Sequence, residues 1–204
     1  MVTNEPRPGR RRDPQVDARI KAAALELYAR LGWAGFTFEA VAREAQIGKP
    51  AIYLRWDSRG QLLFDALDLN VNPQFALQSG SLRSDLIEFG VVMHNWWRSR
   101  AGHAWLRLQL DQQDHEELAE FHIDVVRRNV DESRRIVDSA CSRGELESFE
   151  DGVSLLEIVN GAVLNHIMMT RPERRSWLDV KVHDYVERIV NSVLTPSAGG
   201  SNQV

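Results

Sequence analysis

The sequence predicts an all-α protein. Apolar residues recur at steps of three and four through most of the chain, as on the buried face of a helix, and no stretch alternates in the manner of a strand. Capping residues and prolines precede several of these periodic segments, and glycines follow them. With 204 residues, 43% of them apolar and 26% charged, the composition is that of a soluble globular protein.

The N-terminal part should hold three short helices. The first is expected over residues 14–32, with Asp13 as its N-cap and Gly32 at its exit. Thr37 caps a second helix of about eight residues, and a break of three residues separates it from a third helix that opens at Lys49.

A longer fourth helix and a second group of helices follow. Ser58 and Gln61 have the spacing of a capping box, so the fourth helix should begin there and continue to about residue 72. The stretch NVNPQFALQSGS then reads as a junction. Beyond it, helices are expected over residues 82–100, 103–113, 115–142, 152–171 and 178–194, with the first break at Ala101 and Gly102.

Composition and charge exclude several classes of protein. Cys141 is the single cysteine, so there is neither an internal disulfide framework nor a multi-cysteine metal site, and a reducing cytoplasm is the expected compartment. No apolar run suits a signal peptide or a membrane span. Residues 1–60 carry 11 Lys and Arg against 7 Asp and Glu, whereas the remaining 144 residues carry 14 against 22. A basic N-terminal part on an acidic body is typical of nucleic-acid binding, although ordinary scatter of surface charge would also produce it.

The second and third helices have the form of a helix-turn-helix. In that motif the N-terminal residues of the second helix lie nearest the base edges. Lys49 can donate to guanine, and Pro50 and Ala51 can pack on a thymine methyl group. Residues suited to phosphate are Tyr53, Arg55 and Arg59. The alternative is a plain three-helix core with incidental cations.

The stretch AALELYARLGWAGFTFEAVAREAQIGKPAIYLRWDSRGQLLFDAL resembles the DNA-binding region of the TetR (tetracycline repressor) family over some 45 positions. The resemblance implies phosphate contacts from Thr37, Tyr53 and Arg59. It implies base or groove contacts from Lys49, Pro50, Ala51 and Arg55. Three positions depart from the family pattern: Gln46 stands where a turn glycine is common, Gly48 where Ser or Thr often caps the helix, and Glu39 where some members have a basic residue.

The family resemblance also sets the expected domain organisation. The predicted parts are a disordered basic arm at 1–13, the helix-turn-helix DNA-binding domain at 14–57, a connecting helix at 58–79, an effector-binding and dimerisation domain at 80–195, and a disordered tail at 196–204. In the arm, Arg10, Arg11 and Arg12 can enter a minor groove or follow phosphates, or belong to a solvated tail.

A homodimer is expected because one helix-turn-helix reads only a few base pairs, so a twofold pair should bind a pseudo-palindromic operator in double-stranded DNA. The resemblance places the dimer interface on the last two long helices. The predicted interface residues are Leu156, Val163, Ile167, Val182, Tyr185, Val186 and Ile189.

A dense aromatic set suggests a pocket for an apolar or aromatic small-molecule effector. Its predicted lining is Phe89, Met93, Trp96, Trp97, Trp105, Phe121, Asn165, Met168 and Met169. The alternative is that these side chains are ordinary core.

The expected function is therefore a sequence-specific DNA-binding regulator, a repressor released by its effector. A non-specific architectural DNA-binding protein and a helical small-molecule-binding protein without DNA binding are the alternatives. Neither an enzyme nor a cofactor is expected, because the common catalytic and nucleotide-binding motifs are missing and no histidine has an acidic residue three positions before it for a helical metal site.

Overall fold

The structure, a computed structural model, describes residues 13–68 and 80–194, and within these residues it contains no strand. The all-α prediction is thus confirmed. In chain order the elements are α1 (Pro14–Gly35), α2 (Phe38–Glu44), α3 (Pro50–Tyr53), α4 (Arg59–Asp68), α5 (Leu82–Trp97), α6 (Arg100–Asp111), α7 (Glu116–Ser142), α8 (Phe149–Met169), the 3-10 helix η1 (Pro172–Arg174) and α9 (Arg175–Leu194).

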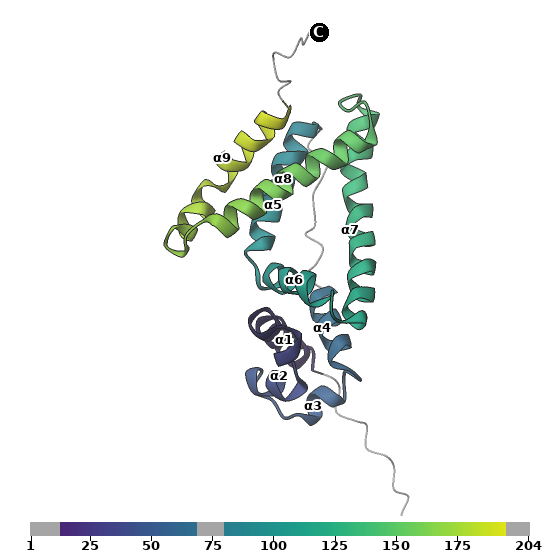
Figure 1. Cartoon of the computed structure of the whole chain (residues 1–204), viewed down its shortest axis with the longest axis vertical. Helices are drawn as coiled ribbons and strands as arrows, with labels where there is room; N and C mark the ends of the chain where they lie inside the picture. The colour runs from purple at the N-terminus through teal and green to yellow at the C-terminus, as the bar shows by residue number, and fades with distance from the viewer. Residues whose placement is uncertain (1–12, 69–79, 195–204) are drawn as a thin grey trace, which may run out of the picture.

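Helices α1, α2 and α3 lie together at one end of the molecule, and α5, α8 and α9 pack at the other (Figure 1). Between the two ends α6 crosses above α1, and α7 runs lengthwise along one side (Figure 1). A continuous apolar core runs from Ile20 in α1 to Val190 in α9. The N-terminal unit is therefore packed directly against the larger helical body.

Local capping explains where the first helices begin. The Asp13 carboxylate accepts a hydrogen bond from the backbone N–H of Gln15, and the Thr37 hydroxyl accepts one from Ala40. Ser58 accepts from Gln61, whose own side chain accepts from the backbone N–H of Asp57. The predicted N-caps at Asp13, Thr37 and Ser58 are therefore present.

The regular part of α1 ends where the sequence indicated. Gly32 has a φ of 66°, and the chain makes one further turn to Gly35 before leaving the helix. Glycine adopts this left-handed conformation without the steric cost that a Cβ brings. The guanidinium of Arg107 also packs where a Cβ on Gly32 would point, so α6 reaches α1 at this position.

The break between α5 and α6 was predicted at Ala101 and Gly102, and this was wrong. It lies at Arg98 and Ser99, because the Ser99 hydroxyl accepts from the Gly102 backbone N–H and caps α6 at an earlier residue. Gly102 is inside α6, where a Cβ would overlap the backbone of Trp96. This glycine permits close packing between two helices and ends neither of them.

Two later helices also begin earlier in the chain than predicted. Ser148 accepts from the backbone N–H of Asp151, so α8 begins at Phe149, before the predicted residue 152. Helix α9 begins at Arg175, ahead of the predicted residue 178. The arm residues Arg10, Arg11 and Arg12, the tail at 196–204 and the predicted helical segment beyond residue 68 lie outside the described residues.

Candidate DNA-binding surface and ligand cavity

The N-terminus of α3 presents a small exposed surface. Lys49 is the N-cap residue, Pro50 opens the helix, and both side chains are exposed, whereas Ile52 on the opposite side is fully buried. Tyr53 is 55% exposed, and its ring stands edge-on to Phe38 with 5.0 Å between ring centroids. Packing therefore holds the Tyr53 ring in place, and the Tyr53 side chain also hydrogen-bonds to the Glu39 carboxylate.

The turn before α3 has an unusual backbone. Gln46 takes a φ of 54°, the left-handed conformation that a glycine would adopt more easily. The carbonyl oxygens of Ala45 and Gln46 both accept from the Arg19 guanidinium, at 2.7 and 3.5 Å. Arg19 on α1 thereby stabilises the turn that sets the orientation of α3.

Thr37 and Ala51 also lie on the α2–α3 unit. Thr37 is half-buried, and its hydroxyl oxygen is occupied by the Ala40 N–H at 3.1 Å, which leaves the hydroxyl hydrogen to donate. Ala51 is half-buried beside Pro50. Both positions are consistent with a role close to a DNA backbone or groove.

Lys49 is paired with an acidic neighbour. Its ammonium donates to the Glu39 carboxylate at 3.2 Å, and both side chains are more than half exposed. A hydrogen bond from its own backbone N–H, then the hydrogen bond and positive charge of Lys49, and last a hydrogen bond from Tyr53 hold the pKa of Glu39 below its usual value. Glu39 is therefore ionised at neutral pH, and the tip of α3 carries a donor and an acceptor side by side.

Arg55 and Arg59 have internal partners. Arg55 forms an ion pair with Asp17 of α1 and donates to the Ala51 carbonyl at 2.7 Å, and its side chain is only 13% exposed. Arg59 donates to the carbonyls of Trp33 and Phe36 at 2.9 and 3.0 Å. Both guanidinium groups tie neighbouring elements together in the free protein.

The same region joins the N-terminal unit to α6. The Arg59 guanidinium stacks on the Trp33 ring, 3.9 Å from its centroid, and the Trp33 backbone N–H donates to the Asp111 carboxylate at 2.8 Å. Arg107 pairs with the other oxygen of Asp111 at 3.4 Å. The end of α1 is thus fastened to the end of α6 by the hydrogen bond from the Trp33 N–H to the Asp111 carboxylate, across 78 residues of sequence.

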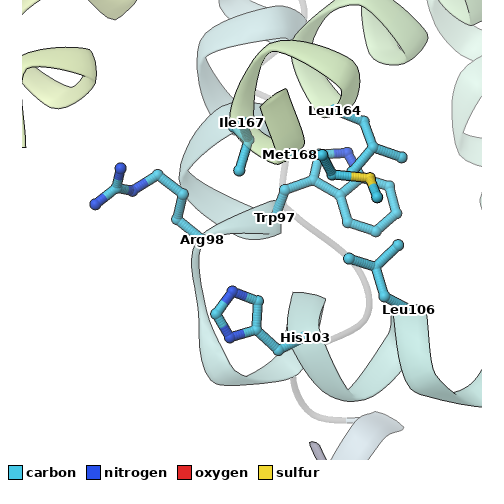
Figure 2. Close-up of a pocket in the computed structure, with 7 residues that line it drawn as sticks. All are labelled: Trp97, Arg98, His103, Leu106, Leu164, Ile167 and Met168. Atoms are coloured by element: carbon cyan, nitrogen blue, oxygen red, sulfur yellow. The ribbon is translucent and has the colours of Figure 1, made fainter. Parts of the chain in front are cut away.

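A cavity of about 330 Å³ lies at the other end of α6, between α5, α6 and α8. Figure 2 shows the Trp97 indole lying between the side chains of Leu164 and Met168 above and Leu106 below. The indole N–H donates to the Asn160 side chain at 2.8 Å, which fixes the ring. The residues that line the cavity are Trp97, Arg98, His103, Leu106, Leu164, Ile167 and Met168.

The predicted ligand-binding residues do not form one lining. Trp97 and Met168 border the cavity, and Trp96 stands edge-on to Trp97 at 4.6 Å. Phe89 and Met93 are buried in the core. Asn165 and Met169 lie on the exposed side of α8.

Two further predicted residues pack between α7 and its neighbours. Phe121 stacks face to face on Phe64 of α4 at 4.0 Å, and Trp105 stacks on His122 of α7 at 5.3 Å. His122 in turn shares a hydrogen bond of 2.9 Å with Gln109. These contacts hold α7 to α4 and α6, away from the cavity at Trp97.

The residues predicted to form the dimer interface point mainly into the core of their own chain. The structure buries four of its members in the core of the same chain: Leu156, Val163, Ile167 and Val186. Val182, Tyr185 and Ile189 are half-buried against that core, and the Tyr185 hydroxyl donates to the Ala162 carbonyl at 3.2 Å. The apolar periodicity thus identified the face of α8 and α9 that packs within the subunit.

The exposed apolar side chains of α8 lie on its other face. Ile158 is 49% exposed, Met168 63% and Met169 76%, and a Cβ on Gly161 would meet no atom within 4 Å. Over an 18-residue window α8 has a mean hydropathy of 1.3, so by length and composition alone it could also span a membrane, as core helices of soluble proteins often could. Only 28% of that window is buried inside the chain.

Several residues of these sites were not identified from sequence. Arg98, His103, Leu106 and Leu164 line the cavity, and Asp111 fastens α6 to α1. The spacing of His103 and Leu106 places them on one helix face, which is a weak sequence signal for a shared site. The sequence carries no such signal for Asp111, because its partner Trp33 is 78 residues away in the chain.

Comparison with known proteins agrees with this arrangement. Residues 20–66 match the family described as "Bacterial regulatory proteins, tetR family", and residues 77–192 match "Tetracyclin repressor-like, C-terminal domain". The HTH-type transcriptional regulator AqdR of Rhodococcus erythropolis is 24% identical over 153 residues, which are 74% of this chain and 73% of AqdR.

Two further comparisons cover more of the chain. An uncharacterized HTH-type transcriptional regulator of Mycobacterium bovis is 26% identical over 190 residues, 89% of this chain and 87% of the relative. The crystal structure of the regulator FadR from Bacillus subtilis, in complex with stearoyl-CoA, superposes with a TM-score of 0.67 at 14% identity, over 86% of this chain and 97% of FadR. The fold is therefore shared with solved regulators of this kind.

Proposed function

Because the chain belongs to the TetR family of bacterial regulatory proteins, we propose that it is a transcriptional repressor that binds a pseudo-palindromic operator as a homodimer and is released by an apolar or aromatic small molecule. Its place of action is the cytoplasm, where bacterial DNA lies. The proposal includes neither a catalytic role nor a membrane partner.

The arrangement of the α2–α3 unit carries this proposal. At the tip of α3, Lys49 and Pro50 are exposed, and the Tyr53 ring packs on Phe38 while 55% of the residue stays exposed. Lysine can donate to guanine in the major groove, and a tyrosine hydroxyl suits a phosphate oxygen. In this proposal Lys49, Pro50 and Ala51 face the bases, and Tyr53 and Thr37 contact the backbone.

The internal partners of Arg55 and Arg59 support a structural role for these two residues. Their bonds to Asp17, Trp33 and Phe36 would have to rearrange before either guanidinium could bind phosphate fully. We therefore propose that these two residues shape the DNA-binding unit and that any phosphate contact they make is secondary.

A homodimer through the outer face of α8 would explain its composition. Ile158, Met168 and Met169 are apolar and exposed, and Gly161 leaves room for a second helix to approach closely. Exposed apolar side chains that gather on one face of a helix favour contact with a partner. A twofold pair would bring two α3 helices to successive turns of one face of the duplex.

The cavity beside Trp97 is the proposed effector site. Its walls are mostly apolar and His103 adds an imidazole group, while the Arg98 guanidinium points away from Trp97 (Figure 2), so an aromatic or aliphatic body with a hydroxyl would suit it. His103 and Leu106 both lie on α6, and the carboxylate of Asp111 at the end of the same helix accepts a hydrogen bond from the Trp33 backbone N–H of α1. A ligand that shifts α6 would thereby turn the DNA-binding unit and favour a pose with lower operator affinity.

The test is fluorescence-anisotropy titration of the full chain on duplex from upstream of its own gene, with scrambled duplex as comparison, across a salt series. We expect the upstream duplex to bind about a thousandfold more tightly. Lys49→Ala should reduce this preference, and Tyr53→Phe should weaken binding to both duplexes alike.

Lys181→Ala is the matched control for Lys49→Ala, because Lys181 also forms an exposed ion pair, with Asp184 at 3.3 Å, but lies on α9 at the far end of the molecule. It should leave both affinities unchanged. Equal affinity of the wild-type protein for every duplex tried, including those enriched from a random pool, would refute sequence-specific binding.

A further inference from the structure

Glu39 and Lys49 form a charge-neutral pair at the exposed tip of α3. The two side chains come from different helices, they are 52% and 56% exposed, and the Glu39 carboxylate lies 3.2 Å from the Lys49 ammonium. We propose that Glu39 and Lys49 act together as a reader of one G·C base pair, with Lys49 on the guanine and Glu39 on the cytosine of the same pair. This inference rests on the proposed function, since it assigns a specificity to the same surface.

The spacing of the pair suits the edge of a G·C pair. In the major groove guanine presents the O6 and N7 acceptors, and cytosine presents the N4 amino donor beside O6. O6 and N4 are hydrogen-bonded to each other, so they lie about 2.9 Å apart, close to the separation of the two protein groups. Lys49 can therefore donate to guanine while Glu39 accepts from cytosine, and the ion pair stays intact.

An A·T pair offers a poorer match in both orientations. It also places a donor, adenine N6, beside an acceptor, thymine O4. With Lys49 on thymine O4, however, the ammonium lies next to the thymine methyl group, and the Glu39 carboxylate lies next to the adenine N7 acceptor. A reversed C·G pair puts each charge opposite the wrong group. With Lys49 opposite adenine N6, likewise, a donor meets a donor, so the pair favours one orientation of G·C over the other three base-pair orientations.

The ion pair also accounts for an acidic residue on a surface that approaches phosphates. A free carboxylate there would repel DNA, and a free lysine would attract any phosphate regardless of sequence. Because each residue offsets the charge of the other, the tip of α3 attracts DNA phosphates less strongly regardless of sequence. Its contribution to binding then depends on which base pair it contacts. Glu39 is thus a specificity-determining residue. This role would explain why the chain has an acidic residue where some family members have a basic one.

The experiment begins by enriching duplexes from a random pool with the wild-type protein, followed by affinity measurements on the enriched duplex with each base pair substituted in turn. We expect one symmetric position at which G·C is preferred by about tenfold or more over the other pairs. Glu39→Gln and Lys49→Ala should both reduce the preference at that position to about twofold, and the preferences at other positions should stay as in the wild type.

Glu44→Gln is the matched control. Glu44 stands at the other end of α2, pairs with Arg30 at 2.9 Å, and loses the same charge on substitution. Both glutamine variants should raise affinity for scrambled duplex to a similar extent, but only Glu39→Gln should change the G·C preference. Thermal unfolding should be unchanged in all three variants because the substituted side chains are exposed.

The outcomes separate the two proposals. If the wild-type protein enriches an operator but Glu39→Gln and Lys49→Ala affect different positions, or a position that is not G·C, the paired reader is refuted and the regulator proposal stands. If Glu39→Gln behaves as Glu44→Gln does at every position, Glu39 only adjusts net charge. If no duplex is enriched, both proposals fail.

Discussion

Replacing Arg59 separates a structural role from a phosphate-binding role. The family resemblance implies that this residue contacts phosphate, but its guanidinium donates to the carbonyls of Trp33 and Phe36 and stacks 3.9 Å from the Trp33 ring centroid. Hydrogen bonds from a charged donor contribute about 1.5–3 kcal/mol each, and a cation–π contact about 0.5–2 kcal/mol. Because the site is half-buried and these contributions overlap, we expect Arg59→Ala to lower the free energy of unfolding by about 2–4 kcal/mol.

The assay is urea and thermal unfolding of the wild type, Arg59→Ala and Arg59→Lys. A loss of this size in a chain of 204 residues corresponds to a fall in Tm of about 5–15 °C. Arg59→Lys should recover little, since one ammonium cannot hold two carbonyls and stack in the manner of a planar guanidinium. Lys49→Ala is the reference for an exposed ion pair and should cost less than about 1 kcal/mol.

Operator binding, measured well below the unfolding transition, completes the test. A structural role predicts that Arg59→Ala leaves the salt dependence of binding close to that of the wild type. The reasoning is refuted if Arg59→Ala keeps the wild-type Tm but reduces the slope of log affinity against log salt by about 0.9, the loss of one phosphate contact.

Three further outcomes follow from local features. Gln46→Gly should raise the free energy of unfolding by up to about 1 kcal/mol, because relief of the left-handed conformation, about 1–2 kcal/mol, exceeds the entropic cost of glycine, about 0.5–1 kcal/mol; a lower urea midpoint would contradict this. Gly102→Ala should cost about 2–3 kcal/mol or prevent folding, since the added Cβ overlaps the backbone of Trp96, and an unchanged Tm would show that α5 and α6 are not so closely packed. Burial holds the pKa of His122 and of His166 below the ordinary value of 6.5, so the unfolded state binds more protons near pH 6 and stability should fall as the pH drops below about 7; His122→Gln should flatten this dependence in urea titrations, and an equally steep curve would exclude His122 as a source.

Much of the local structure follows from short-range rules that the sequence displays. A cap acts on backbone groups two or three residues away, so Asp13, Thr37 and Ser58 could be identified as helix starts before any fold was known. The departure at Gln46 was visible in the same way, and the structure gives that residue the left-handed backbone of the glycine it replaces. Where a competing cap stood nearby, as at Ser99, the prediction chose the glycine and misplaced the break.

Side chains with long-range partners could not be assigned in this way. From the sequence Arg55 and Arg59 are expected to be exposed cations. In the structure Arg55 pairs with Asp17, 38 residues earlier, and Arg59 donates to Trp33, 26 residues earlier. Similarly, the apolar spacing in α8 shows which residues share a face but not whether that face packs within the subunit or against another. The structure turns Val163 inward and Met168 outward.

By itself the sequence determined the helical class, the helix-turn-helix and the family of this protein, because helix periodicity, caps and the motif are properties of neighbouring residues. Only the tertiary structure decided that Lys49 is paired with Glu39, that α6 fastens the DNA-binding unit through Asp111, and that Trp97 borders a cavity. These features depend on which helix faces meet in space, and that is set by the packing of the whole core, which no single segment of the chain encodes.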